Sequence, residues 1–174
     1  IARGNGRAYG DSALNPAATI DMRGFNRILA FDDATGQVVA EAGVLLADLI
    51  DVFLPRGWFP AVTPGTRFVS LGGAIASDVH GKNHHKDGAF GSFVDWVEVL
   101  CPDGEIRRAS HSENAELFGW TTGGMGLTGV ILREGWRPIK RAAGPSPVGA
   151  AAGGVDSGLH PSPTAKPSQR SVTG

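Results

Sequence analysis

The chain has 174 residues and a formal net charge of -1, which excludes a general electrostatic attraction to nucleic acid or to an anionic membrane. Its length suffices for one domain with a buried core, and the single cysteine, Cys101, excludes an intramolecular disulfide. No apolar run approaches the roughly 18 residues that a membrane-spanning helix needs. Because the sequence begins inside what reads as a loop, we expect a chain truncated at its start. Localisation therefore stays open between the cytoplasm and the cell envelope.

The first half of the chain predicts short strands and then helices. Strands are predicted at residues 19–22, 28–31 and 37–42. A helix is predicted over 45–54, because Leu45, Leu49 and Phe53 recur at helical spacing before Pro55 and a glycine end the pattern. A short apolar helix is predicted at 71–77.

The second half predicts a hairpin, a helix and a last strand. Residues 94–100 and 105–109 read as paired strands, since Pro102-Asp-Gly104 between them has turn chemistry. Ser110 or Ser112 is expected to cap a helix through Leu117-Phe118, with Glu113 completing a capping box. Residues 128–136 read as the final strand.

The composition changes near the end of the chain. From residue 141 onward, 22 of 34 residues are Gly, Ala, Pro or Ser. Such a segment buries too little apolar surface to offset its ordering entropy. We therefore predict a domain at 1–137 and a disordered tail at 138–174.

Two glycine-rich polar stretches carry the functional signal. Thr63–His85 holds Pro64-Gly-Thr66 and the pair Gly72-Gly73, and Ala2–Ser12 holds three glycines interleaved with two arginines. Glycines let backbone N–H groups approach a ligand closely, and the start of a helix favours anions. The two loops together predict a bipartite cradle for one phosphate-bearing cofactor.

Two glycine patterns invite comparison with the dinucleotide fingerprint. Gly4-x-Gly6-x-x-x-Gly10 has one residue too many, and Gly124-x-Gly126-x-x-Gly129 follows a predicted helix and runs into a predicted strand. The fingerprint must instead follow a strand and open a helix. We interpret the second pattern as a tight turn and reject a Rossmann site.

The polar side chains leave alternatives open. Asp78, His80, His84 and His85 could ligate a metal, as in a metal hydrolase, although Gly81 interrupts any helix that would align them, so no metal site is predicted. The histidines also fit a solvated loop. Arg3 and Arg7, the two arginines of the first loop, could be surface charges, but their glycine neighbours favour contact with phosphate.

Four segments together resemble a known family. They are Arg3-Gly-x-Gly-Arg-x-Tyr-Gly-Asp11, Pro64-Gly-Thr-Arg67, Gly72-Gly-Ala-Ile-Ala-Ser-Asp-Val-His-Gly-Lys-Asn-His-His85 and Gly123-Gly-Met-Gly-Leu-Thr-Gly129. Over residues 2–137 the chain resembles the PCMH-type FAD-binding domain of the vanillyl-alcohol-oxidase family, and within it the decaprenylphosphoryl-β-D-ribose 2′-oxidases. The resemblance implies an α+β fold with two subdomains, here incomplete, and a substrate domain beyond this chain.

The resemblance also implies the residues that bind FAD. The loop that wraps the pyrophosphate corresponds to Ala2, Arg3, Gly4, Asn5, Gly6, Arg7, Ala8, Tyr9, Gly10, Asp11 and Ser12. The segments that line the dinucleotide and the flavin correspond to Gly65, Thr66, Ser70, Leu71, Gly72, Gly73, Ser77, Asp78, Val79 and His80. Ile131 matches a residue on the adenine side. Tyr9 stands where several relatives carry a histidine bonded to the flavin, so we expect non-covalent FAD.

The implied reaction is the oxidation of a secondary alcohol of a polyprenyl-phosphate sugar to a ketone, with hydride passing to the flavin. His80 is expected beside the flavin and Lys82 near the substrate phosphate. A separate reductase would complete the epimerisation of the sugar for cell-wall arabinan synthesis, and any membrane association would be peripheral. Without the substrate domain the chain is not expected to turn over. Oxidation of an alditol or a lactone, and an inactive flavin-binding remnant, remain alternatives.

Overall fold

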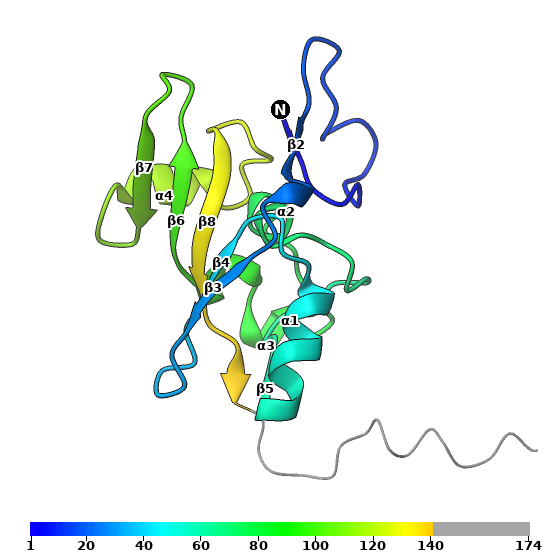
Figure 1. The fold of residues 1–174 in the computed structure, drawn as a ribbon, viewed down its shortest axis with the longest axis vertical. Helices are drawn as coiled ribbons and strands as arrows, with labels where there is room; N and C mark the ends of the chain where they lie inside the picture. Colours follow the sequence, from blue (N-terminus) through cyan, green and yellow to red (C-terminus); the bar gives the residue numbers. More distant parts are fainter. Residues whose placement is uncertain (141–174) are drawn as a thin grey trace, which may run out of the picture. The chain divides into compact units, whose positions relative to one another are not determined.

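The computed structural model describes residues 1–140, and the remaining residues, 141–174, lie outside the described part, as does most of the predicted tail. The centre of the fold is a five-stranded antiparallel sheet with the order β3-β4-β8-β6-β7 (Figure 1). Its strands are β3 Ile28–Phe31, β4 Val38–Glu41, β6 Val94–Leu100, β7 Ile106–Ser110 and β8 Val130–Trp136. The strands predicted near 28–31, 37–42, 94–100, 105–109 and 128–136 are confirmed.

Two small sheets flank the central one. β1, Ala2–Arg3, pairs in parallel with β2, Ile20–Asp21, and β5, Trp58–Phe59, pairs antiparallel with β9, Ile139–Lys140. β9 lies beyond residue 137, at which the predicted domain ends, so the described fold continues past that residue. The prediction stopped there because a two-residue strand has no recognisable periodicity.

The helices are short. They are α1 Leu46–Phe53, α2 Leu71–Ala76, α3 His84–Asp87 and α4 Ala115–Thr121, and the 3-10 turns are η1 Met22–Gly24, η2 Leu54–Arg56 and η3 Phe90–Phe93. Among the described residues, no helix has the length and apolar content needed to cross a bilayer. α1 confirms the predicted helix. The 3-10 turn η2 follows α1 directly and ends at Gly57, which has a left-handed φ of 81°.

The start of α4 differs from the prediction. Ser110 is the last residue of β7, and its hydroxyl accepts hydrogen bonds from the N–H groups of Ser112 and Glu113 at 3.2 and 3.0 Å. The residue before the helix is Asn114, in a left-handed conformation with φ 47°. The serine therefore closes a local turn instead of capping the helix.

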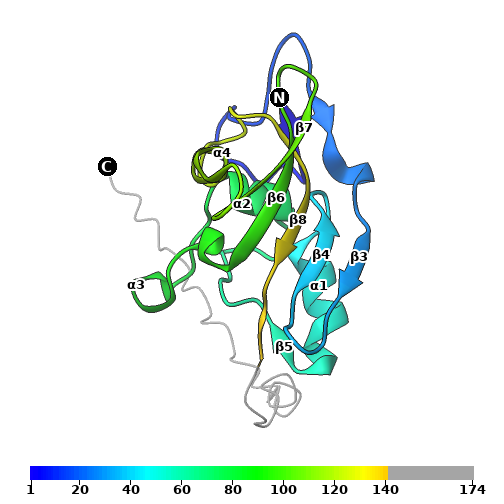
Figure 2. The ribbon, with the colours of Figure 1, turned by 90° about the vertical axis from the view of Figure 1, so that its left-hand side faces the viewer.

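The hydrophobic core lies between one face of the sheet and the helices α1 and α2, which both views place on the same side of the strands (Figures 1 and 2). Leu46, Leu49, Leu71 and Ile75 supply its helical side. These apolar positions recur at helical spacing, so burying them fixes how both helices meet the sheet.

One buried residue of the sheet is ionisable. Glu134 of β8 lies opposite Ala40 and Val97 in the neighbouring strands and is 0% exposed. Neither carboxylate oxygen has a hydrogen-bond partner within the described part of the chain. Burial in these apolar surroundings raises the pKa of Glu134 well above its ordinary value, because the charged form is poorly solvated there.

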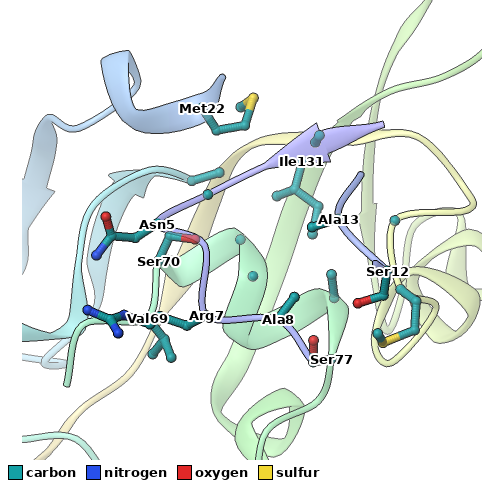
Figure 3. A pocket seen from close by; sticks show the side chains of 18 of the residues that line it. Asn5, Arg7, Ala8, Ser12, Ala13, Met22, Val69, Ser70, Ser77 and Ile131 are labelled. Atoms are coloured by element: carbon teal, nitrogen blue, oxygen red, sulfur yellow. The ribbon is translucent and has the colours of Figure 1, made fainter. Parts of the chain in front are cut away.

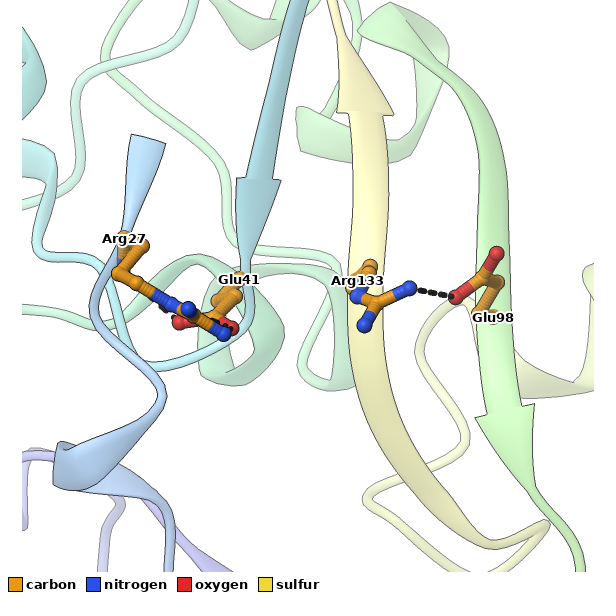
Figure 4. A network of polar contacts seen from close by, with 4 residues as sticks. All are labelled: Arg27, Glu41, Glu98 and Arg133. Atoms are coloured by element: carbon orange, nitrogen blue, oxygen red, sulfur yellow. Dashed lines mark hydrogen bonds and ion pairs between the residues drawn. The ribbon is translucent and has the colours of Figure 1, made fainter. Parts of the chain in front are cut away.

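Charged side chains alternate in sign across the strands (Figure 4). Arg133 lies opposite Glu41 on one side and Glu98 on the other, and its Nη1 is 3.4 Å from the Glu98 Oε2. Arg27 donates its Nη2 hydrogen to the Glu41 Oε1 at 2.6 Å and its backbone N–H to the Glu41 Oε2 at 3.0 Å. The side-chain hydrogen bond from Arg27 holds the pKa of Glu41 below its ordinary value.

Candidate functional site

The two glycine-rich loops face one cavity of about 130 Å³ (Figure 3). The N-terminal loop passes over α2, and Ile131 of β8 lies at the same cavity. The structure thus brings together most of the residues predicted to bind the cofactor. Those that line the cavity are Ala2, Gly4, Asn5, Gly6, Arg7, Ala8, Ser12, Ser70, Gly72, Gly73, Ser77, Val79 and Ile131.

Two direct contacts join the loops. The side-chain amide of Asn5 donates a hydrogen bond to the Phe68 carbonyl at 2.9 Å. Gly4 packs so closely on Ser70 that a Cβ at Gly4 would overlap the Ser70 hydroxyl. A side chain at position 4 would therefore displace Ser70, and Gly4 allows the two loops to meet closely beside the cavity.

The start of α2 is hydrogen-bonded to the segment between β4 and α1. The N–H groups of Leu71 and Gly72 donate to the carbonyls of Val44 and Ala42, both at 2.9 Å. A Cβ at Gly72 would lie 2.8 Å from the Ala42 Cβ, so this glycine serves close packing. The N–H groups of Leu71 and Gly72 are therefore already bound, and Gly73 alone of the first three residues has no backbone acceptor among those described.

The two arginines of the first loop differ in position. Arg7 lines the cavity, and its guanidinium lies 5.7 Å from the centre of the Phe68 ring. Arg3 belongs to β1. A Cβ added at Gly6 would lie 3.0 Å from the Arg3 Nη2. Of the two arginines, only Arg7 lines the cavity, whereas the guanidinium of Arg3 lies beside Gly6.

Several other predicted residues lie outside this cavity. Tyr9 is 95% exposed, and Gly10 has open space around it. Leu71 is fully buried in the core. The complete set of predicted cofactor residues that do not line the cavity is Arg3, Tyr9, Gly10, Asp11, Gly65, Thr66, Leu71, Asp78 and His80.

The cavity also contains residues that the sequence did not indicate. They are Ala13, Met22, Ala42, Val69, Ala76, Met125, Gly126 and Gly129. Three of them belong to the segment Gly123–Gly129, which joins α4 to β8 and docks on the end of α2 through a hydrogen bond of 2.7 Å from the Met125 N–H to the Ala76 carbonyl. Its place between a helix and a strand confirms that it is a turn and not a dinucleotide fingerprint. The glycine spacing of this segment was visible in the sequence, but it did not by itself indicate that the segment lines a cavity.

His80 and Lys82 line a second, more open hollow. Gly65, Gly81 and His84 share it, together with Phe59 of β5. The rings of His80 and His84 lie 5.1 Å apart. Within residues 1–140 no three His, Cys, Asp or Glu side chains are grouped so as to hold a metal ion.

The fold is that of an α+β domain in which two glycine-rich segments, far apart in sequence, meet at one cavity. Residues 1–110 match the family model described as FAD binding domain, and the chain belongs to this family. The family resemblance and the mixed helix and strand class read from the sequence are thereby confirmed.

Three relatives are oxidases or oxidoreductases by name. Decaprenylphosphoryl-beta-D-ribose oxidase of Mycolicibacterium smegmatis is 49% identical over 135 residues, which are 76% of this chain and 29% of the relative. L-gulonolactone oxidase of Bos taurus is 34% identical over 129 residues, 74% of this chain and 29% of the relative. An FAD-linked oxidoreductase of Penicillium janthinellum is 35% identical over 109 residues, 62% of this chain and 23% of the relative. The chain thus spans less than a third of the length of each.

Proposed function

We propose that this chain is the FAD-binding part of a flavin-dependent oxidoreductase that oxidises a secondary alcohol of a sugar to a ketone. The observation that carries the proposal is the convergence of two glycine-rich loops, distant in sequence, on one cavity in a chain of the FAD binding domain family. The identity of 49% to decaprenylphosphoryl-beta-D-ribose oxidase favours a polyprenyl-phosphate ribose as substrate of the whole protein.

The residues of the cavity fit FAD. Gly4 and Gly6 present backbone instead of side chains, and Arg7 supplies a cation beside them, which suits a pyrophosphate. Met22, Val69 and Ile131 offer apolar surface to an aromatic ring system. The cavity of about 130 Å³ is smaller than the roughly 300–1,000 Å³ of ordinary ligand pockets, so it would enclose only part of such a cofactor.

The cofactor is proposed to bind without a covalent bond. Tyr9 occupies the position at which the family resemblance places a histidine bonded to flavin in several relatives, and its side chain is 95% exposed. A phenol is a poor partner for that bond. The loop therefore holds FAD through backbone groups and through Arg7.

FAD, when bound, supplies the hydride acceptor. The chain's own contribution is proposed to be orientation and charge: the imidazole of His80 faces the substrate, and the ammonium of Lys82 meets its phosphate. Both line the second hollow, next to the segment that borders the cavity. Further partners belong to the whole protein: a reductase that completes the epimerisation, and a membrane surface contacted only peripherally.

A lactone or alditol as substrate is the second candidate. The relative named L-gulonolactone oxidase favours it, but at 34% identity this relative is less similar than the ribose oxidase. The residues that choose between these sugars are proposed to lie outside the matched region.

Flavin titration tests the proposed function. The purified chain is added to FAD, and the flavin fluorescence is expected to change with saturation, more strongly than with riboflavin, which lacks the pyrophosphate. Denaturation in acid should release all flavin into the filtrate if binding is non-covalent. Fluorescence that stays constant up to a large excess of protein would contradict the proposal.

A further inference from the structure

Asp78, two residues beyond the end of helix α2, has a backbone conformation that usually belongs to glycine. The Asp78 N–H donates to the Ile75 carbonyl at 2.9 Å, and the Val79 N–H donates to the Ala74 carbonyl at 3.0 Å. These two bonds form the Schellman motif, in which the residue after the helix is left-handed. That residue is Asp78, with φ +39°. Aspartate is one of the few residues with a side chain that tolerate this region, and at a cost that glycine avoids.

The carboxylate of Asp78 closes a loop. Its Oδ1 accepts a hydrogen bond of 2.8 Å from the Gly91 N–H. Beside it, the Phe90 N–H donates to the Val79 carbonyl at 2.9 Å. Because these two bonds join both ends of residues 79–90, the segment between them is held as one closed loop.

The closing contact leaves no free space. A Cβ at Gly91 would lie 3.0 Å from the Asp78 Oδ1 and would overlap the Thr122 methyl group. Phe90, the last residue of the loop, is 0% exposed and stacks parallel on Trp136 at a ring distance of 5.8 Å. The loop is therefore attached to the core at its end, and the Asp78 side chain attaches this end to α2.

Asp78 lies between the two hollows. Ser77 and Val79 on either side of it line the cofactor cavity, whereas His80 and Lys82 line the second hollow. Asp78 itself lines neither of them. A change in the backbone at this residue would move the loop that carries His80 and Lys82 relative to the cavity.

We propose that Asp78 is a positioning residue. Its carboxylate binds the backbone of Gly91 instead of the cofactor, holds residues 79–90 closed, and thereby keeps His80 and Lys82 beside the bound flavin. The role in flavin placement rests on the proposed function, whereas the closure of the loop is independent of it.

Two substitutions separate the side-chain bond from the backbone conformation. Asp78→Gly keeps the left-handed conformation without strain but removes the acceptor, and Asp78→Asn keeps both, since its amide oxygen can accept the same bond. In the full chain, hydrogen exchange at the Gly91 amide and over residues 79–90 should accelerate about tenfold in Asp78→Gly and stay at the wild-type rate in Asp78→Asn. The thermal midpoint should stay near wild type in both.

The flavin supplies the functional measurement. With FAD bound, the visible circular dichroism of the flavin should change in Asp78→Gly and not in Asp78→Asn. Asp32→Gly is the matched control, because Asp32 accepts a backbone hydrogen bond of 2.9 Å from Ala34 in a turn that lines neither hollow. It should loosen only its own turn and leave the flavin signal unchanged.

Each outcome decides one question. Unchanged exchange over residues 79–90 in Asp78→Gly overturns the closure of the loop by Asp78. Faster exchange with wild-type flavin dichroism overturns the positioning role. A wild-type chain that binds no FAD overturns the proposed function and the flavin placement, and the exchange measurement then still decides whether Asp78 closes the loop.

Discussion

Gly4 and Ser70 touch where the two loops of the cavity meet, and a Cβ at Gly4 would overlap the Ser70 hydroxyl. Gly4→Ala is therefore expected to push the loops apart and weaken FAD binding about tenfold, as overpacking of roughly 1.4 kcal/mol would do. Flavin fluorescence titration measures the change. Ser70→Gly in the same chain should restore part of the affinity. Gly24→Ala is the control, because a Cβ at Gly24 would meet nothing within 4 Å. Equal affinities for all these chains would disprove the contact.

Arg7 should bind the phosphates of the cofactor. Arg7→Ala is expected to lower the affinity for FAD about tenfold, as loss of a charge-assisted hydrogen bond would, and to reduce its dependence on salt. The matched control is Arg56→Ala, since Arg56 lies 5.7 Å from the Phe53 ring centre, as Arg7 does from Phe68, but outside the cavity. Riboflavin binding should be the same in wild type and Arg7→Ala. A loss of FAD affinity equal to that of Arg56→Ala would show that Arg7 makes no phosphate contact.

Glu134 should reduce stability as the pH rises. Its pKa in the folded chain is raised above the ordinary 4.5, so stability is full below that value and is lost as the pH rises towards the folded-state pKa. Glu134→Met removes an unpartnered carboxyl at similar volume and should raise the free energy of unfolding at pH 8 by about 1–3 kcal/mol. Urea unfolding at pH 5 and pH 8 tests this.

Two comparisons sharpen the test of Glu134. The advantage of Glu134→Met over wild type should shrink from pH 8 to pH 5, whereas Glu116→Met, at an exposed position of α4, should show no such change. An advantage that is constant with pH would mean that the pKa of Glu134 in the folded chain is not raised above its value in the unfolded chain.

The pair of Arg27 and Glu41 should act in the opposite direction. Arg27 lowers the folded-state pKa of Glu41, so its contribution is present above the unfolded value near 4.5 and is lost as the pH falls through the lower folded-state value. Arg27→Met should be less stable than wild type at pH 7, and the difference should narrow in acid. Because the Arg27 side chain is 71% exposed, solvent screens the pair and the loss is small.

A second ion pair serves as the comparison for Arg27. Arg23 pairs with Asp21 at 2.7 Å, but this carboxylate is 57% exposed, against 3% for that of Glu41. In urea unfolding at pH 7, Arg23→Met should therefore lower the free energy of unfolding by less than Arg27→Met does. The reverse order would contradict the view that burial of the carboxylate decides the effect.

Periodicity and turn chemistry were enough to predict much of the fold. The helix over 45–54 and the hairpin around Pro102-Asp-Gly104 were correct because their signals are local. The predicted cap of α4 was wrong because Ser110 is the last residue of β7. Its place in that strand depends on pairing with Trp96, which is distant in sequence.

The cavity could be predicted only in part. Most of the N-terminal loop, together with Ser70, Gly72 and Gly73, was predicted because glycine-rich polar segments are visible in sequence. Met22 and Val69 carry no such mark, since they reach the cavity only through the packing of the sheet. Gly72 was predicted to contact the ligand. A Cβ at this position would however collide with Ala42, so close packing against Ala42 accounts for much of the requirement for glycine.

Helix α2 is held at both ends by partners far away in sequence: Val44 and Ala42 receive its first N–H groups, and Gly123 and Met125 bind its last carbonyls. Six residues are too few to be helical alone in water. In refolding, then, amide protons of this segment should become protected only after those of the strands, and the ligand cradle is a late product of the folding pathway.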